Sequence, residues 1–368
     1  MPSHVSLLTG LEPHSHGVTG DVQHMGPAFV TIASWLSEQG FDTAAVVNTI
    51  LLGPGRGFQN GFQHFELVAA EPWEASAPEI HRRALAWLDR PRDLPFFLFL
   101  YYYDVHSDYV LAEDYRARFV EPYDGPATGS TEQLKEVRLG RLTFTARDAK
   151  HLSDLYDAEI RQFDDELGGF LAELERRGLL DETAILLTSG HGEEFLEHGD
   201  VLHGRALYDE LVHVPLIVAG PGVPAGRRVA GPASLVDVFP TATSLLGVTP
   251  PAYTEGVDLT ARGFRAPARE RALHFATDRW LGRPEGAWKR GVQVEGWKLH
   301  YAHPDGSVEL YDLAADPAEL RNRAAEEPER AERLRELLAP RLRASEAASP
   351  TVTTEEEREM LRALGYIE

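Results

Sequence analysis

The chain of 368 residues contains no cysteine, which excludes disulfides and zinc sites built from thiolates. It has no uninterrupted apolar run of about 18 residues, the length that a membrane-spanning helix needs. Its first residues, MPSHVSLLTG, lack the basic start and the long apolar stretch of a signal peptide. A small scaffold that depends on cross-links is excluded as well, because a chain of this length can bury a large core.

Basic residues are scarce relative to acidic ones. There are 36 Lys and Arg against 58 Asp and Glu, which gives a formal net charge of -22. A field of this sign repels nucleic acid and anionic membranes, so neither is expected as a partner. Any anion that binds must meet a local patch of positive charge, and a metal ion with converging His and Arg side chains is the usual solution.

An acidic segment that carries several histidines follows one predicted strand. Residues 184–187 are apolar and lead into a Ser-Gly-His-Gly turn. Ligands of open α/β sheets bind where loops leave the carboxyl ends of the strands, so a site is expected here. Five side chains within thirteen residues could bind a metal or transfer protons: His191, Glu193, Glu194, His198 and His203. A solvated acidic surface loop is the alternative interpretation.

Apolar periodicity predicts an alternation of helices and strands over most of the chain. Helices are expected at 28–40, 76–89, 148–180 and 234–247, the last interrupted by Pro240, and strands at 41–48, 95–103 and 214–220. The unbroken apolarity of 95–103 favours a central strand that is covered on both faces. The glycine-rich connection at 49–61 lacks the Lys and Ser or Thr of a phosphate-binding loop, so a turn-rich surface loop is expected.

The last hundred residues have a different pattern. Short strands separated by turns are expected at 272–277, 291–293, 297–302 and 308–310, with a helix at 326–342 packed on them. The sequence therefore predicts an α/β protein with a mostly parallel central sheet and a small carboxyl-terminal antiparallel sheet. The expected boundaries are a catalytic domain at 1–266, a subdomain at 267–345 and a tail at 346–368 that ends in a short amphipathic helix.

Four separated strings resemble the sulfatase family of the alkaline phosphatase superfamily. They are PSHVSLLTG at the start, DVHSDY after the 95–103 strand, TSGHGEEF with LEHG and YDELVHVPL, and WKLHYAHPDGSVELYDL near the end. The resemblance implies an alkaline-phosphatase-like α/β/α sandwich. It also implies a metal-dependent hydrolase that acts on a small-molecule or glycan sulfate ester.

The first string implies that part of the family pattern lies upstream. In sulfatases the element C/S-x-P-S-R-x-x-LLTG carries the nucleophile at its first position, and Met1 corresponds to the second. The nucleophile and the acidic metal-binding pair of the first strand are therefore expected before Met1, as in an amino-terminally truncated sulfatase. The chain as written is expected to be cytoplasmic, or exported if a leader has been lost. A Pro-Ser turn that caps a helix is the alternative interpretation of the string.

The resemblance assigns roles to six residues. The catalytic residues are His4, His106 and His203, the substrate-binding residues are Ser3 and Asn48, and the metal ligand is His191. His4 stands where the family has Arg, while His106 and His203 become sulfate contacts and general acids. An isolated His after a strand can also be a structural hydrogen-bonding residue, which is the alternative for His106. The four imidazoles are expected to surround one cavity.

One departure from the family concerns the metal, which is expected to be calcium or magnesium. Gly190 stands where the family has a metal-binding Asp. Hard divalent cations prefer oxygen ligands, so the remaining site would bind calcium weakly or would accept zinc or manganese. Three functions stay open: an active sulfatase, a phosphodiesterase or phosphatase of the same superfamily, and a non-catalytic homologue that binds an anion or a partner. Gly190 favours the last of these.

Overall fold

The computed structural model describes residues 1–20, 23–68, 77–261, 263–265, 270–278 and 287–344. These residues form two compact units that are each discontinuous in sequence. Of the described residues, unit 1 comprises those within 1–25, 184–193 and 203–344, and unit 2 comprises those within 26–183 and 194–202. The predicted helix at 353–368 lies outside the described residues.

Unit 2 is built on a parallel sheet of three strands. The order is β2 (His64–Leu67), β1 (Asp42–Val47) and β3 (Phe96–Tyr101). The small and β-branched side chains of β1 are almost all fully buried, as its central position requires. Within this sheet β3 pairs with β1 and is half-buried along its whole length. The expectation that 95–103 forms a central strand covered on both faces stays a prediction.

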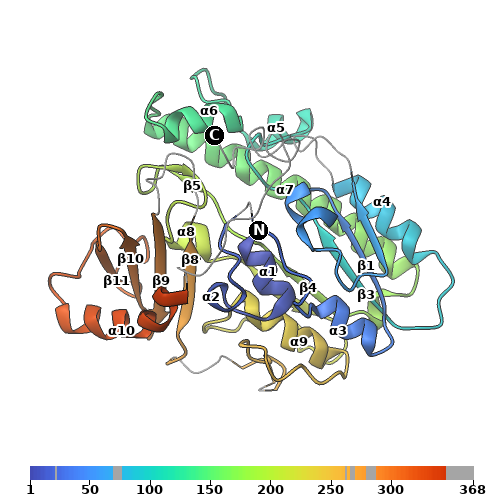
Figure 1. The fold of residues 1–368 in the computed structure, drawn as a ribbon. Coiled ribbons are helices and arrows are strands. Elements are labelled where there is room, and N and C mark those ends of the chain that lie inside the picture. The colour runs from blue at the N-terminus through green and yellow to red at the C-terminus, as the bar shows by residue number, and fades with distance from the viewer. Residues whose placement is uncertain (21–22, 69–76, 262, 266–269, 279–286, 345–368) are drawn as a thin grey trace. The chain divides into compact units, whose positions relative to one another are not determined.

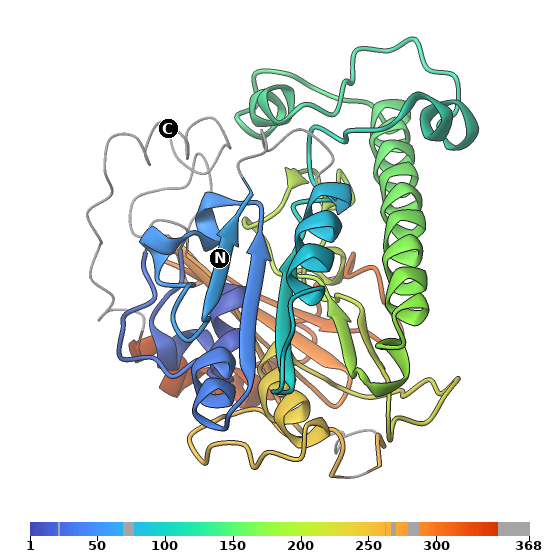
Figure 2. The same ribbon diagram turned by 90° about the vertical axis from the view of Figure 1, so that its right-hand side faces the viewer.

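Helices cover this sheet through apolar faces. They are α3 (Ile32–Glu38), α4 (Ala77–Leu88) and the 31-residue α7 (Ala146–Arg176), which runs beside α4 in Figure 2. Thr145 starts α7 with a capping box to Asp148, which satisfies two backbone amides at the helix start. Trp87 of α4 and Phe170 of α7 pack with Ala44 of β1 in one apolar cluster. The predicted helices at 28–40, 76–89 and 148–180 are thus confirmed with small shifts at their ends.

The remaining elements of unit 2 are short. They are α5 (Glu113–Phe119), α6 (Thr131–Arg138), β5 (Glu194–Phe195), β6 (Val201–Leu202), and the 3-10 turns Ile50–Leu52, Pro54–Arg56 and Leu180–Glu182. The glycine-rich connection after β1 is not the predicted surface loop. Its side chains Leu51, Leu52 and Arg56 are buried, because the first turn directs apolar residues inward.

Unit 1 contains the amino-terminal helices and the strand before the predicted site. Its elements before residue 250 are α1 (Pro2–Thr9), α2 (Pro13–His16), β4 (Ile185–Thr188), α8 (Asp209–Val212), β7 (Leu216–Ala219), the 3-10 turn Leu235–Asp237 and α9 (Val238–Leu245). The strand β4 pairs antiparallel with β7 and is half-buried. Pro240 does not interrupt α9, because it lies in the first turn, where its missing N–H costs no helical hydrogen bond.

The second part of unit 1 confirms the predicted antiparallel sheet. Four strands, β8 (Leu273–Thr277), β9 (Trp288–Val294), β10 (Trp297–His303) and β11 (Val308–Asp312), form a sheet in the order β11-β10-β9-β8. The helix α10 (Pro328–Ala344) lies against this sheet (Figure 1) and buries Leu334 and Leu338 among its apolar side chains. The α/β class, with a parallel sheet and a separate antiparallel sheet, is therefore confirmed. Among the helices that the structure describes, none is long and apolar enough to cross a membrane.

A buried lysine joins the antiparallel sheet to the chain that follows His203. The Lys298 side chain is fully buried, and its Nζ donates to Asp209 Oδ1 at 2.7 Å and to Glu319 Oε2 at 3.1 Å. Glu319 Oε2 also accepts from the backbone amide of Asp209 at 2.6 Å. Asp209 is the first residue of α8, so this network fixes the position of α8 against β10.

Replacing Lys298 by Met is expected to lower the free energy of unfolding by about 3–5 kcal/mol, because two carboxylates lose the cation between them. Urea unfolding monitored by tryptophan fluorescence measures this change. Lys289→Met on the neighbouring strand β9 is the control, and it should cost less than about 1 kcal/mol. Equal costs for both variants would contradict the role given to Lys298.

Candidate functional site

The helix α1 presents Ser3 and His4 in its first turn. Pro2 begins the helix with the backbone angle that a helix needs, and Gly10 ends it in the left-handed conformation (φ 68°). Val5 and Leu8 are fully buried and hold the helix in unit 1. The first turn therefore has a fixed position, and its side chains are available to a site.

The imidazole of His4 fills the space beside Gly190. A Cβ atom added at Gly190 would lie 2.7 Å from His4 Cε1, 3.4 Å from His4 Nε2 and 3.3 Å from Ser3 Oγ. The first of these distances is shorter than any ordinary contact. A side chain at position 190 would therefore overlap the end of the His4 ring, which would have to shift.

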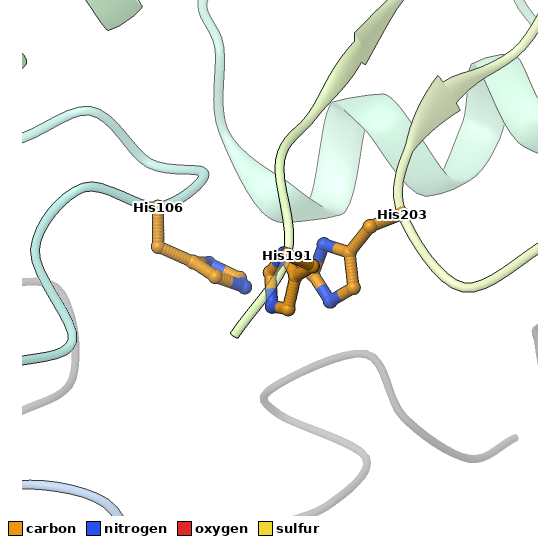
Figure 3. A group of neighbouring side chains, drawn as sticks. All are labelled: His106, His191 and His203. Atoms are coloured by element: carbon orange, nitrogen blue, oxygen red, sulfur yellow. The ribbon is translucent and has the colours of Figure 1, made fainter. Parts of the chain in front are cut away.

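His191 and His203 stack on each other in unit 1 (Figure 3), with ring centroids 3.7 Å apart and ring planes 21° apart. His191 follows the end of β4, and its Nδ1 lies 2.9 Å from the backbone oxygen of Gly192. Because a carbonyl oxygen only accepts, Nδ1 must carry a proton. The neutral imidazole then has its lone pair on Nε2, which is the form that binds a cation.

Glu193 fixes the orientation of His203. Its side chain is 2% exposed, and its Oε1 accepts a hydrogen bond from His203 Nδ1 at 2.7 Å. The same oxygen lies 3.9 Å from His191 Nδ1. A buried carboxylate paired with Nδ1 sets the tautomer of a histidine and stabilises its protonated form. The sequence identifies Glu193 as one of five residues of the acidic segment that could bind a metal or transfer protons, but it gives Glu193 no individual role. The burial of its side chain in the structure identifies it as the partner of His203.

Burial lowers the pKa of two imidazoles in this group. Burial, then the positive charge of the amino terminus and then the nearby His191 hold the pKa of His4 well below its ordinary value of 6.5. Burial and then repulsion from His203 also lower the pKa of His191, although 35% of its side chain is exposed. Both rings are therefore neutral at neutral pH.

Asn48 and His106 belong to unit 2. Asn48 directly follows β1, and the loop with His106 follows β3, so both leave the same edge of the parallel sheet. His106 is buried, its ring packs against Tyr103 at 4.3 Å, and its Nδ1 lies 3.0 Å from Ser107 Oγ. The other four predicted residues belong to unit 1. The convergence of all four imidazoles on one cavity stays a prediction.

Adding one methyl group at Gly190 is expected to destabilise the protein by about 1–3 kcal/mol, because the new Cβ overlaps the His4 ring. In a His4→Ala background the same Gly190→Ala change should cost almost nothing, so a double-mutant cycle should give a coupling energy of about 1–3 kcal/mol. Thermal or urea unfolding of the four proteins measures it. The control is Gly168→Ala on α7, where no atom lies within 4 Å of the added Cβ. Additive effects at 190 and 4 would refute the overlap.

Sequence comparison relates the chain to known hydrolases. The family model described as "Sulfatase" matches residues 1–248, and the model of the carboxyl-terminal part of N-sulphoglucosamine sulphohydrolase matches residues 197–347. Arylsulfatase K of Mus musculus is 34% identical over 194 residues, which cover 50% of this chain and 35% of the mouse protein. Arylsulfatase K of Danio rerio is 31% identical over 200 residues, which cover 53% of this chain and 38% of the zebrafish protein. The chain thus matches little more than a third of the length of these relatives.

Solved structures share the fold. A protein in complex with its substrate, D-glucosamine-2-N,6-O-disulfate, superposes with a TM-score of 0.78 at 20% identity over 95% of this chain and 89% of that one. The phosphonate monoester hydrolase of Agrobacterium radiobacter superposes with a TM-score of 0.73 at 24% identity, over 93% of this chain and 86% of the hydrolase chain. These similarities confirm the predicted fold class. Because the sulfatase model covers more than half of its length, the chain belongs to the sulfatase family.

Proposed function

We propose that this chain forms a site that hydrolyses sulfate esters of a small molecule or glycan. Membership of the sulfatase family and the similarity to arylsulfatase K support this reaction class. The observation that carries the proposal is the pair formed by His203 and the buried Glu193, because it supplies an oriented proton-transfer group. A solved structural neighbour was captured with a sulfated glucosamine as its substrate, which supports a sulfated sugar as the ligand class.

In this proposal His203 protonates the alcohol that leaves sulfur. The carboxylate of Glu193 binds Nδ1–H and stabilises the imidazolium, so the proton to be transferred is on Nε2. A positioned general acid of this kind contributes about 10²- to 10⁴-fold to the rate. His203 therefore acts on the leaving group, and Glu193 acts through His203.

Four further residues are proposed to contact the substrate or to lie beside the nucleophile. Ser3 and His4 occupy the first turn of α1, whose amides favour an anion. Asn48 and His106 are assigned by their places after β1 and β3 and by the family resemblance.

The side chains near Gly190 do not fit calcium or magnesium. Calcium takes six to eight oxygen ligands and magnesium requires an octahedron of oxygens. Near Gly190, unit 1 offers the imidazoles of His4, His191 and His203, and the carboxylate of Glu193 accepts from His203. A side chain at position 190 would require the His4 ring to move. We propose that His191 binds a cation that accepts nitrogen ligands readily, such as zinc, which when bound would polarise an ester oxygen.

A non-catalytic homologue that binds an anion is the second candidate, and the absence of a side chain at Gly190 favours it. Binding of sulfate without turnover of any ester would support this candidate. Faster turnover of an aryl phosphate than of an aryl sulfate would instead support a phosphatase or phosphodiesterase of the same superfamily.

Removing the proposed general acid should reduce hydrolysis of an aryl sulfate. His203→Ala is expected to lower kcat by about 10²- to 10⁴-fold, and Glu193→Gln by about 10- to 100-fold, because Gln accepts from Nδ1–H but does not stabilise the imidazolium. Steady-state turnover by the longest protein that the gene encodes measures both effects. Glu197→Gln, an exposed residue of the same segment, is the control. Unchanged kcat in His203→Ala would exclude this role.

Calorimetric titration should show tighter binding of zinc than of calcium, because the donors near Gly190 are mainly nitrogens. His191→Ala should weaken the binding of zinc by at least about tenfold. His213→Ala is the matched control, since that side chain is 80% exposed in unit 1. Tighter binding of calcium, or equal zinc affinity in both variants, would contradict the assignment of His191.

A further inference from the structure

The main chain at His203 is not held by regular secondary structure. Residues 203–208, all of which the structure describes, form neither helix nor strand. His203 lies between two residues with positive φ angles, Leu202 (φ 64°) and Gly204 (φ 85°). A residue other than glycine adopts such an angle only where its surroundings hold it. The position of the His203 backbone therefore depends on contacts that the neighbouring residues make.

Thr277 makes such a contact directly beside His203. Its hydroxyl donates a hydrogen bond to the backbone oxygen of Gly204, which lies 73 positions away in the chain. Thr277 is the last residue of β8 and pairs with Lys289 of β9, so its own main chain is held by the antiparallel sheet. The sheet thus fixes the carbonyl group of the residue that follows His203.

The same sheet contacts the segment again further along. Leu207 is buried, and a Cβ atom added at Gly291 of β9 would lie 3.3 Å from Leu207 Cδ1, so these two residues pack closely. The hydroxyl of Tyr208 donates to Glu309 Oε2 on β11 at 3.2 Å. Both contacts lie four or five positions beyond His203, farther along the chain than the hydrogen bond from β8.

The restraint of the main chain complements the hydrogen bond on the ring. Glu193 Oε1 accepts from His203 Nδ1 at 2.7 Å, which restrains one edge of the imidazole. The proposed proton donor, Nε2, lies at the opposite edge and moves when the main chain moves, because the side chain can rotate about two bonds. A displacement of about 1 Å at a reacting group can cost about 10²-fold in rate. A fixed backbone beside His203 therefore determines where the proton is delivered.

We propose that Thr277 is a positioning residue for His203. Its hydrogen bond to the Gly204 oxygen fixes the main chain, so that the imidazole keeps its Nδ1–H on Glu193 and its Nε2 in place. The consequence for turnover rests on the proposed role of His203 as general acid, whereas the hydrogen bond and its effect on the ring do not. Valine at 277 has nearly the same shape without the hydroxyl, and serine keeps the hydroxyl.

Two measurements on the longest protein that the gene encodes test this proposal. With an aryl sulfate, Thr277→Val should lower kcat by about 10-fold with little change in KM, and Thr277→Ser should restore kcat to within about threefold of wild type. Nitrogen-15 NMR of the His203 ring should show a mixture of both tautomers in Thr277→Val and Nδ1–H alone in Thr277→Ser. The matched control is Thr254→Val, because the Thr254 hydroxyl also donates to a backbone oxygen of unit 1, that of Pro251 at 3.0 Å. It should leave kcat and the His203 signals unchanged.

An unchanged His203 spectrum in Thr277→Val would overturn the proposal, whatever the effect on kcat. A changed spectrum with unchanged kcat would support the positioning of the ring and would instead refute the role of His203 as general acid. If Thr277→Val does not fold, an experimental structure of the wild type decides the question. Thr277 Oγ1 within hydrogen-bonding distance of the Gly204 oxygen would support the proposal, and a larger separation would overturn it.

Discussion

The hydrogen bond between Glu193 and His203 is the interaction on which the proposed chemistry depends. It joins a buried carboxylate to an imidazole that also stacks on His191, so three functional groups take their positions from one contact. The buried Lys298 network holds α8, which begins six residues after His203, against the antiparallel sheet. Packing of the carboxyl-terminal part of unit 1 therefore supports the segment that carries the pair.

Two side chains of unit 1 serve different purposes. Glu193 faces an imidazole that can share its charge. The ring of His4 occupies the space of a side chain at 190. The resulting group in unit 1 is rich in imidazoles and poor in carboxylates. This composition is why we expect a cation that prefers nitrogen ligands.

Much of the fold could be predicted from sequence because periodicity reports which side chains are buried. The apolar periodicity of 148–180 predicted the helix α7, and the short strands predicted after residue 270 form the antiparallel sheet. Strand order could not be predicted, since 41–48 and 95–103 are both apolar, and only pairing shows β1 between its neighbours. Glu193 was named among five residues that could bind a metal or transfer protons, but its burial and its hydrogen bond to His203 could not be predicted, because charge in a sequence suggests exposure. The contact between the His4 ring and position 190 is between residues almost 190 positions apart in the sequence. No local sequence pattern predicts such a contact.

The protonation of the His203 ring tests the central claim most directly. Nitrogen-15 NMR of histidine-labelled protein, assigned by comparison with His203→Ala, reports which ring nitrogen carries the proton. We expect Nδ1 to stay protonated through the whole pH titration while Nε2 alone gains and loses a proton, because Glu193 accepts from Nδ1. A neutral ring with its proton on Nε2, or a mixture of both tautomers, would contradict the account.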